Sequence, residues 1–197
     1  MSDVLQQGET DRQHLIVGLG NPGGRYRGTR HNLGFRVVTE LADRMTLKLD
    51  RVECNALIAE TSGLILAAPQ TYMNRSGFAV RCLVERRHVP PGDTLIVYDD
   101  VHLVLGRMRL RSGGGPGGHR GIESVIQSLQ TEAIPRLRLG VAAADSGPID
   151  DDMVEFVLSP FEPEEHQAVA ELILRAADAC ESWVGDGAEA TMNRFNC

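Results

Sequence analysis

The chain has 197 residues, of which 42% are hydrophobic and 24% charged, and its formal net charge is −7. This length suits one domain with a sizeable core, and the balance of apolar and charged residues excludes a disordered chain. No apolar run approaches the roughly 20 residues of a membrane span, and the N-terminus lacks the basic and apolar regions of a signal peptide, so we expect a frayed leader at residues 1–13 and one domain at residues 14–197.

The charge is distributed unevenly along the chain. Residues 1–139 hold 18 basic and 14 acidic side chains, whereas residues 140–197 hold 2 and 13. All basic residues except Lys48 are arginines, the side chain that suits planar recognition of phosphate, although a GC-rich genome would produce the same preference. Because a local basic face matters more than the net charge, the acidic total does not exclude a nucleic-acid partner.

Hydrophobic periodicity predicts strands and helices that alternate along the chain. In chain order, the predicted elements are a strand at 15–17, a helix at 32–48, strands at 54–61 and 64–68, a helix at 74–88, strands at 94–98 and 106–111, a helix at 120–129, a strand at 136–141 and a helix at 163–183. Asn32 is the predicted N-cap of the first helix. The apolar run at 94–98, typical of a central buried strand, ends at Asp99-Asp100. This alternation favours a single-domain, three-layer α/β/α fold.

Two glycine-rich segments differ from known phosphate-binding loops. Gly18, Gly20 and Gly23 have the spacing of the dinucleotide-binding fingerprint, but that motif requires a helix that starts on the glycines. Here Pro22 and eight further polar or glycine residues precede the next predicted helix. The second segment, residues 112–118, is not followed by the Gly-Lys-Ser/Thr of a P-loop. Neither segment therefore predicts a nucleotide site.

His31, which follows the first glycine-rich turn, is the best candidate for a general base among the six histidines, because a neutral imidazole can accept a proton from water near neutral pH. A lone loop histidine is often only solvated surface. Asp99 strengthens the functional interpretation, since a carboxylate at the end of a buried strand could orient an imidazole. Asp99 and Asp100 could instead bind a metal, but no further acidic or histidine cluster supports this. Because a Gly-x-Ser-x-Gly nucleophile motif is also absent, the pair points to an activated water.

Asn21 and Asn74 are neutral amides beside predicted breaks in secondary structure. One interpretation makes Asn21 a turn former and Asn74 a helix cap. The other makes them donors to a substrate carbonyl or to a developing oxyanion. Spacing alone leaves both interpretations open.

Arginines and tyrosines surround these candidates in the sequence. Arg107, Arg109 and Arg111 alternate along one predicted strand and therefore share a face. A phosphate-binding surface could combine them with Arg25, Arg27, Arg30, Arg120, Arg136 and Arg138. The ordinary alternative is a solvated face with acidic partners. Tyr26 and Tyr72 could stack on a base or only line a pocket.

The four cysteines are scattered, at positions 54, 82, 180 and 197. They form no Cys-x-x-Cys pair and have no histidines at metal-binding spacing. We expect reduced, mostly buried thiols in a cytoplasmic protein.

Together, these segments resemble the bacterial peptidyl-tRNA hydrolases over nearly the whole chain. The matching motifs are G-L-G-N-P-G-x-x-Y-x-x-T-R-H-N-x-G (18–34), T-Y-M-N-x-S-G (71–77), Y-D-D (98–100), G-G-x-G-G-H-x-G (114–121), R-L-R-x-G (136–140) and W-x-x-D-G…N-R-F-N (183–196). The resemblance implies a monomeric, cytoplasmic esterase with a twisted mixed β-sheet between layers of helices. It also implies cleavage of the ester that joins a peptide to the 3′ ribose of tRNA, with contacts to the acceptor stem and 3′ end and without a metal or organic cofactor.

The resemblance also assigns roles to individual residues. It makes His31 the base that activates water and Asp99 the support of its basic form. Asn21 would discriminate blocked from free aminoacyl-tRNA, and Asn74 would orient the scissile carbonyl. The implied contacts to tRNA or substrate are Tyr26, Tyr72, His119, Arg120, Arg109, Arg111 and Arg138.

One position departs from the family pattern. Many relatives have asparagine where this chain has Arg120, and a guanidinium cannot accept a hydrogen bond. We expect Arg120 to tune substrate binding while the His31–Asp99 pair remains intact.

Two other functions compete with this one. A non-catalytic RNA-binding relative, such as the chloroplast intron-splicing factors, would carry an added apolar partner-binding surface and a transit peptide. An esterase or peptidase of small blocked substrates would not need an arginine-rich face. The acidic segment 145–165 is either a mobile lid or a solvated loop, and protection of its amides on adding tRNA would distinguish the two.

Overall fold

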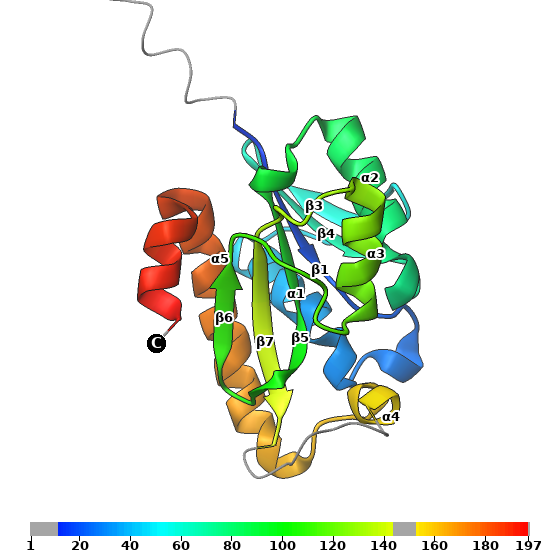
Figure 1. Ribbon diagram of the computed structural model, residues 1–197, viewed down its shortest axis with the longest axis vertical. Helices are drawn as coiled ribbons and strands as arrows, with labels where there is room; N and C mark the ends of the chain where they lie inside the picture. Colours follow the sequence, from blue (N-terminus) through cyan, green and yellow to red (C-terminus); the bar gives the residue numbers. More distant parts are fainter. Residues whose placement is uncertain (1–11, 144–152, 197) are drawn as a thin grey trace, which may run out of the picture.

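Across residues 12–143 and 153–196, which the computed structural model describes, seven strands form one mixed sheet in the order β2-β3-β4-β1-β5-β7-β6 (Figure 1). The strands are β1 (His14–Gly18), β2 (Arg51–Glu53), β3 (Ala56–Glu60), β4 (Leu64–Pro69), β5 (Thr94–Val104), β6 (Met108–Arg111) and β7 (Arg136–Ala142). The four central strands, β4, β1, β5 and β7, are parallel, whereas β3 and β6 pair antiparallel with β4 and β7. The carboxyl ends of the four parallel strands therefore meet at one edge of the sheet, where open α/β folds bind ligands.

Helices cover both faces of the sheet (Figure 1). They are α1 (Leu33–Arg44), α2 (Ser76–Arg87), α3 (Arg120–Leu129), α4 (Met153–Leu158) and α5 (His166–Phe195). Alternate residues of each strand face opposite layers: Ile16 packs in the cluster with α1 and α5, and its neighbours Leu15 and Val17 pack in the cluster with α2 and α3. The predicted three-layer fold is confirmed. In the described ranges, every helix is too short or too polar to cross a lipid bilayer.

A glycine lets the start of α1 lie directly on the ends of the strands. A Cβ atom at Gly34 would be 2.3 Å from the carbonyl oxygen of Val97 and 2.5 Å from the nitrogen of Leu19. A larger residue would therefore displace α1 from the sheet. The short 3-10 helix η2 (Arg30–Asn32), which precedes α1 and contacts β5, holds His31 at the carboxyl edge.

Several predicted boundaries are wrong. β5 does not end at Asp99 but continues to Val104, because Asp99 and Asp100 remain paired with β7 before the register shifts. α5 extends beyond residue 183 to Phe195 with a break at Gly187, whose φ of 83° is favourable only for glycine. β2 was not predicted. Residues 145–152 of the acidic segment, and residues 1–11 of the predicted leader, lie outside the described residues.

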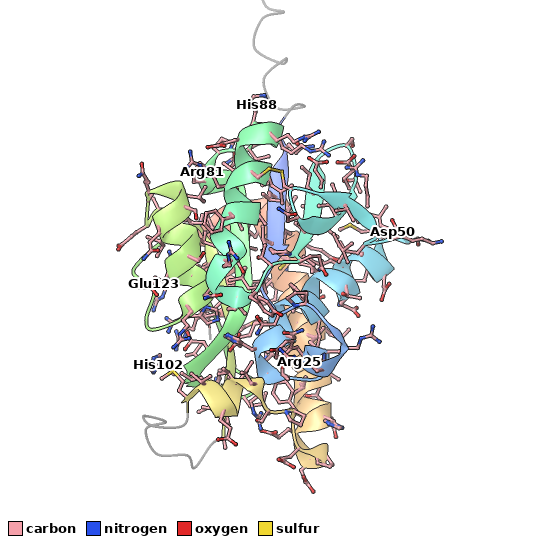
Figure 2. All side chains as sticks on the ribbon, turned by 90° about the vertical axis from the view of Figure 1, so that its right-hand side faces the viewer. Arg25, Asp50, Arg81, His88, His102 and Glu123 are labelled. Carbon is pink, nitrogen blue, oxygen red and sulfur yellow. A yellow bond between two sulfur atoms is a disulfide. The ribbon has the colours of Figure 1, made fainter. Side chains whose placement is uncertain are left out.

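Cys54 and Cys82 form a disulfide that ties the β2–β3 turn to α2 (Figure 2). The prediction of reduced, mostly buried thiols is wrong for this pair, whose Cα atoms are 5.6 Å apart. The fold brings the two residues together across 28 positions, a proximity that spacing does not reveal. Cys180 is a buried thiol, as predicted, and burial raises its pKa. Cys197 lies outside the described residues.

Candidate active site

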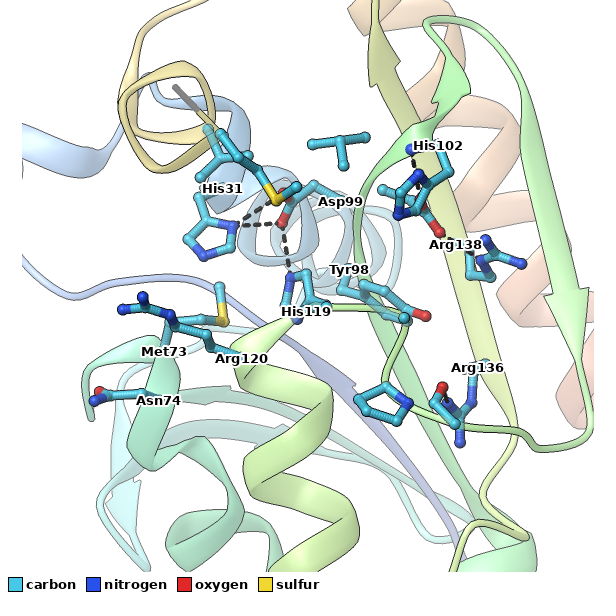
Figure 3. A pocket seen from close by; sticks show the side chains of 18 of the residues that line it. His31, Met73, Asn74, Tyr98, Asp99, His102, His119, Arg120, Arg136 and Arg138 are labelled. Atoms are coloured by element: carbon cyan, nitrogen blue, oxygen red, sulfur yellow. Dashed lines mark hydrogen bonds and ion pairs between the residues drawn. The ribbon is translucent and has the colours of Figure 1, made fainter. Parts of the chain in front are cut away.

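A cavity of about 500 Å³ opens at the carboxyl edge of the parallel strands. Glycines and Pro116 of the segment before α3 form one wall, and α4 contributes an apolar wall through Met153, Val154, Val157 and Leu158. Nine of the eleven residues to which the family resemblance gives a role line this cavity: Asn21, His31, Tyr72, Asn74, Asp99, Arg111, His119, Arg120 and Arg138. Figure 3 shows several of them around it. Tyr26 and Arg109, the other two of the eleven, do not line it. The fold therefore brings together segments far apart in the sequence.

His31 and Asp99 form a hydrogen-bonded pair at the centre of the cavity. The Nδ1 atom of His31 is 2.9 Å from both carboxyl oxygens of Asp99, whose side chain is only 1% exposed (Figure 3). Burial alone would raise the pKa of Asp99, but the neighbouring His31 charge and hydrogen bonds from His119 and His31 hold that pKa below its ordinary value. Asp99 is therefore a carboxylate near neutral pH, Nδ1 of His31 carries the shared hydrogen, and Nε2 is the nitrogen left to accept a proton.

Asn21 joins the loops that follow β1 and β4. Its Oδ1 atom accepts the backbone N–H of Met73 at 2.8 Å. The side chain of Asn32 binds both backbone groups of Asn21, at 2.8 and 2.9 Å. Asn32 occupies the predicted N-cap position of α1 but makes no side-chain cap bond, because its amide is used in this contact. Since Oδ1 of Asn21 is engaged, its Nδ2 group is the part available to a ligand.

Asn74 and Tyr72 line the cavity from the segment that follows β4, and Asn74 lies on the same side of the cavity as Arg120 (Figure 3). Asn74 belongs to the 3-10 helix η3 (Met73–Arg75) and is exposed. The interpretation of Asn74 as a helix cap is wrong, since Tyr72 and Arg75 occupy the cap positions of η3 and α2. The ring of Tyr72 is 55% exposed at the cavity. Tyr26, by contrast, is half-buried outside the cavity, where the Arg25 guanidinium lies over its ring.

The arginines predicted to form one phosphate-binding surface fall into different environments. Arg111 and Arg120 are exposed at the cavity, and Arg109 is exposed on the same face of β6 as Arg111. Arg138 lines the cavity but is ion-paired with Asp100. The prediction is wrong for two arginines that the fold buries: Arg30 is 5% exposed and bound to Glu165, and Arg136 is 3% exposed and donates to backbone carbonyls. Whether an arginine is available to bind phosphate therefore depends on carboxylates and carbonyl groups from other segments of the chain.

Sequence reasoning missed two features of the site. The first is the contact of His119 with Asp99, whose oxygen Oδ1 is 3.3 Å from Nε2. The second is the anchoring of α4, through Arg30, beside the candidate base. His119 directly precedes the predicted helix at 120–129, but histidine is not among the preferred N-cap residues, and no local signal marked either feature.

One ligand atom from each of His31, Asp99 and His119 lies within 4.8 Å of the others, a spacing that a metal ion could use. The same atoms already hydrogen-bond at 2.9 and 3.3 Å. These hydrogen bonds fully explain why the three side chains converge. Asp100, the other predicted metal candidate, accepts from the backbone of His102 and pairs with Arg138.

Known proteins match the chain over almost its full length. The peptidyl-tRNA hydrolase family model matches residues 15–197. The peptidyl-tRNA hydrolase of Methylacidiphilum infernorum is 42% identical over 185 residues, covering 93% of this chain and 97% of the relative. That of a Synechococcus species is 48% identical and covers 92% of this chain and 82% of the relative. A crystal structure of the enzyme from Acinetobacter baumannii aligns with a TM-score of 0.86 at 31% identity, covering 95% of this chain and 96% of the other.

Proposed function

Because this chain belongs to the peptidyl-tRNA hydrolase family and is an esterase of peptidyl-tRNA, we propose that His31 is the base that activates the attacking water. The observation that carries this proposal is the hydrogen bond of its Nδ1 atom to buried Asp99, at 2.9 Å, which directs Nε2 away from the carboxylate. A base oriented in this way needs no protein nucleophile.

The proposed reaction has two proton transfers. Nε2 of His31 takes a proton from water as the resulting hydroxide attacks the ester carbonyl, and Asp99 stabilises the imidazolium. The tetrahedral intermediate then expels the 3′ oxygen of the ribose, which receives the proton from His31. The products are tRNA with a free 3′ hydroxyl and a peptide carboxylic acid, which ionises to the carboxylate by releasing its proton to water, and His31 is regenerated.

The two asparagines complete the proposed site. The Nδ2 group of Asn21 would donate to the carbonyl oxygen of the acyl group that blocks the substrate's amino group, because the Oδ1 atom of Asn21 is already bound to Met73. Asn74, exposed at the cavity, would donate to the scissile carbonyl as negative charge develops on its oxygen. Both roles use neutral amide donors.

For the tRNA moiety, we propose phosphate contacts from Arg111, Arg109 and Arg120, with Arg138 as a further contact once its pair with Asp100 is rearranged. Tyr72 would stack on the 3′ end, and Tyr26 would contact tRNA outside the cavity. We further propose that the protein acts as a monomer in the cytoplasm.

The test compares two substrates. We expect wild-type protein to release N-acetyl-amino acid from N-acetyl-aminoacyl-tRNA and to leave the unblocked aminoacyl-tRNA essentially intact. Binding of tRNA without cleavage would favour a non-catalytic RNA-binding protein. Equal cleavage of a small N-blocked amino-acid ester would favour a general esterase.

Replacement of Arg120 by asparagine is expected to raise the KM for N-acetyl-aminoacyl-tRNA several-fold and to leave kcat nearly unchanged. Arg120 is exposed at the cavity, so it supplies a cation for the tRNA backbone rather than a hydrogen-bond acceptor for water. Loss of one phosphate contact should also reduce the salt dependence of binding by about one counterion. Steady-state kinetics at several salt concentrations would measure both effects, and a large rise in kcat for R120N would contradict the proposal.

A further inference from the structure

His119 lies at the N-cap of α3 with both ring nitrogens hydrogen-bonded. Its Nδ1 atom accepts the backbone N–H groups of Gly121 and Ile122, at 3.1 and 3.2 Å. Its Nε2 atom is 3.3 Å from Oδ1 of Asp99. The side chain is only 10% exposed, so these bonds are largely shielded from water.

The two bonds to Nδ1 determine where the ring carries its hydrogen. A nitrogen that accepts N–H groups cannot itself bear a hydrogen. The hydrogen of His119 is therefore on Nε2, where it faces Asp99. Since Asp99 is an acceptor on both oxygens, it receives one N–H group from His119 and one from His31.

Ring contacts fix the orientation of this donor. The ring of Tyr98 lies on one side of His119, with centroids 4.7 Å apart, and the ring of His31 lies 5.0 Å away (Figure 3). The ring of His119 also lies close to the backbone of Gly121: a Cβ atom at this glycine would be only 2.9 Å from Cε1 of His119. The ring therefore has little room to move. His119 is consequently held between the sheet, α3 and the candidate base.

We propose that His119 is a positioning residue that locks the Asp99 carboxylate and thereby the direction of Nε2 in His31. A carboxylate held only by His31 could rotate together with that ring. A second donor, anchored through the backbone of α3, fixes Oδ1 of Asp99 independently of His31. This inference rests on the proposed role of His31 as base, and it gives His119 a role other than the contact to substrate implied by the family resemblance.

The test uses the variants His119→Asn and His119→Ala. Asparagine is a favourable N-cap, so H119N keeps the bonds to the α3 backbone, but its side chain is too short to reach Asp99. H119A loses both contacts. His88→Asn is the matched control, since His88 has a left-handed φ of 53°, which asparagine tolerates, and lies at the end of α2 far from His102 of the cavity (Figure 2).

With N-acetyl-aminoacyl-tRNA as substrate, H119N should lower kcat roughly 10- to 100-fold, the effect of one hydrogen bond to a charged group, and change KM less than about two-fold. H119A should match H119N in kcat but melt at a lower temperature. Imidazole ¹⁵N spectra should show hydrogen on Nδ1 of His31 in the wild type and a mixture of tautomers in H119N. H88N should resemble the wild type in each measurement.

A raised KM with unchanged kcat in H119N would overturn the proposal in favour of a substrate contact. Full activity in H119N together with loss of activity in H119A would also overturn the proposal, because only the capping of α3, and not the contact with Asp99, would then affect turnover. Different measurements test the two proposals. An active His31→Ala variant would refute the role of His31 as base. An unchanged His31 tautomer in H119N would refute the positioning role of His119.

Discussion

Replacement of His31 by alanine is expected to lower kcat/KM for N-acetyl-aminoacyl-tRNA by roughly 10²- to 10⁴-fold, the usual contribution of a positioned base. The nitrogen that would accept the proton disappears, while the other cavity residues remain in place. Binding of tRNA should persist, because the exposed arginines Arg109 and Arg111 belong to β6 and not to η2, the element that carries His31. Single-turnover hydrolysis, together with the affinity for deacylated tRNA, would separate the two effects.

Asp99→Asn provides the companion test of the pair. An amide N–H group directed at Nδ1 of His31 would favour the tautomer with hydrogen on Nε2, which cannot accept a proton. We therefore expect a loss comparable to that of His31→Ala, although the volume of the side chain barely changes. Near-normal turnover in D99N would show that the carboxylate does not orient the base, and near-normal turnover in H31A would exclude His31 as the base.

The sequence contains enough information to predict the sheet, its covering layers and the edge at which the candidate site lies. The apolar run at 94–98 predicted a central buried strand, and its residues Leu95 and Ile96 pack in the two opposite cores. The carboxyl ends of parallel strands are a general ligand site, so Asn21, His31 and Asp99 could be expected at one edge. The family motifs added the candidate roles, which the geometry accommodates.

What could not be predicted depends on contacts between distant segments. Arg30 and Arg111 are both arginines in polar surroundings, yet Arg30 is buried against Glu165, which is 135 positions away, and Arg111 is exposed. The same reason applies to the Cys54–Cys82 disulfide. The ends of strands are equally hard to predict from the sequence. The pairing of Asp99 and Asp100 with β7 extends β5 through two residues of low strand propensity.

Arg30, the residue before the candidate base, anchors the segment that follows α4. Its guanidinium donates to both carboxyl oxygens of Glu165, at 3.0 and 2.7 Å, and lies 4.5 Å and 4.6 Å from the ring centres of Phe156 and Phe161. Its backbone N–H also binds the carbonyl of Ser159, at 3.0 Å. Of the predicted acidic segment 145–165, the described part from residue 153 onward is thus attached directly beside His31.

Arg30→Met is therefore expected to lower the free energy of unfolding by about 1–3 kcal/mol, because it leaves the partly buried Glu165 without its cation and with only the backbone N–H of Glu162 as a donor. Arg44→Met is the matched control: Arg44 pairs with Glu40, Asp178 and Glu181 at the surface, and its loss should cost at most about 1 kcal/mol. Urea unfolding at neutral pH would measure both variants. An effect of R30M no larger than that of R44M would show that the buried pair does not stabilise the fold.

The pH dependence of the loss of stability in R30M tests whether the ion pair between Arg30 and Glu165 is its cause. Burial alone would raise the pKa of Glu165, but its hydrogen bond to Arg30 holds that pKa below the ordinary carboxyl value. The contribution of the pair is therefore complete above about pH 4.3, the ordinary value for glutamate, and is lost as the pH falls through the lowered pKa of the folded state. The difference in stability between wild type and R30M should accordingly narrow in acid. A difference that stays constant down to about pH 3 would mean that packing of the arginine between Phe156 and Phe161, and not its charge, holds α4 beside His31.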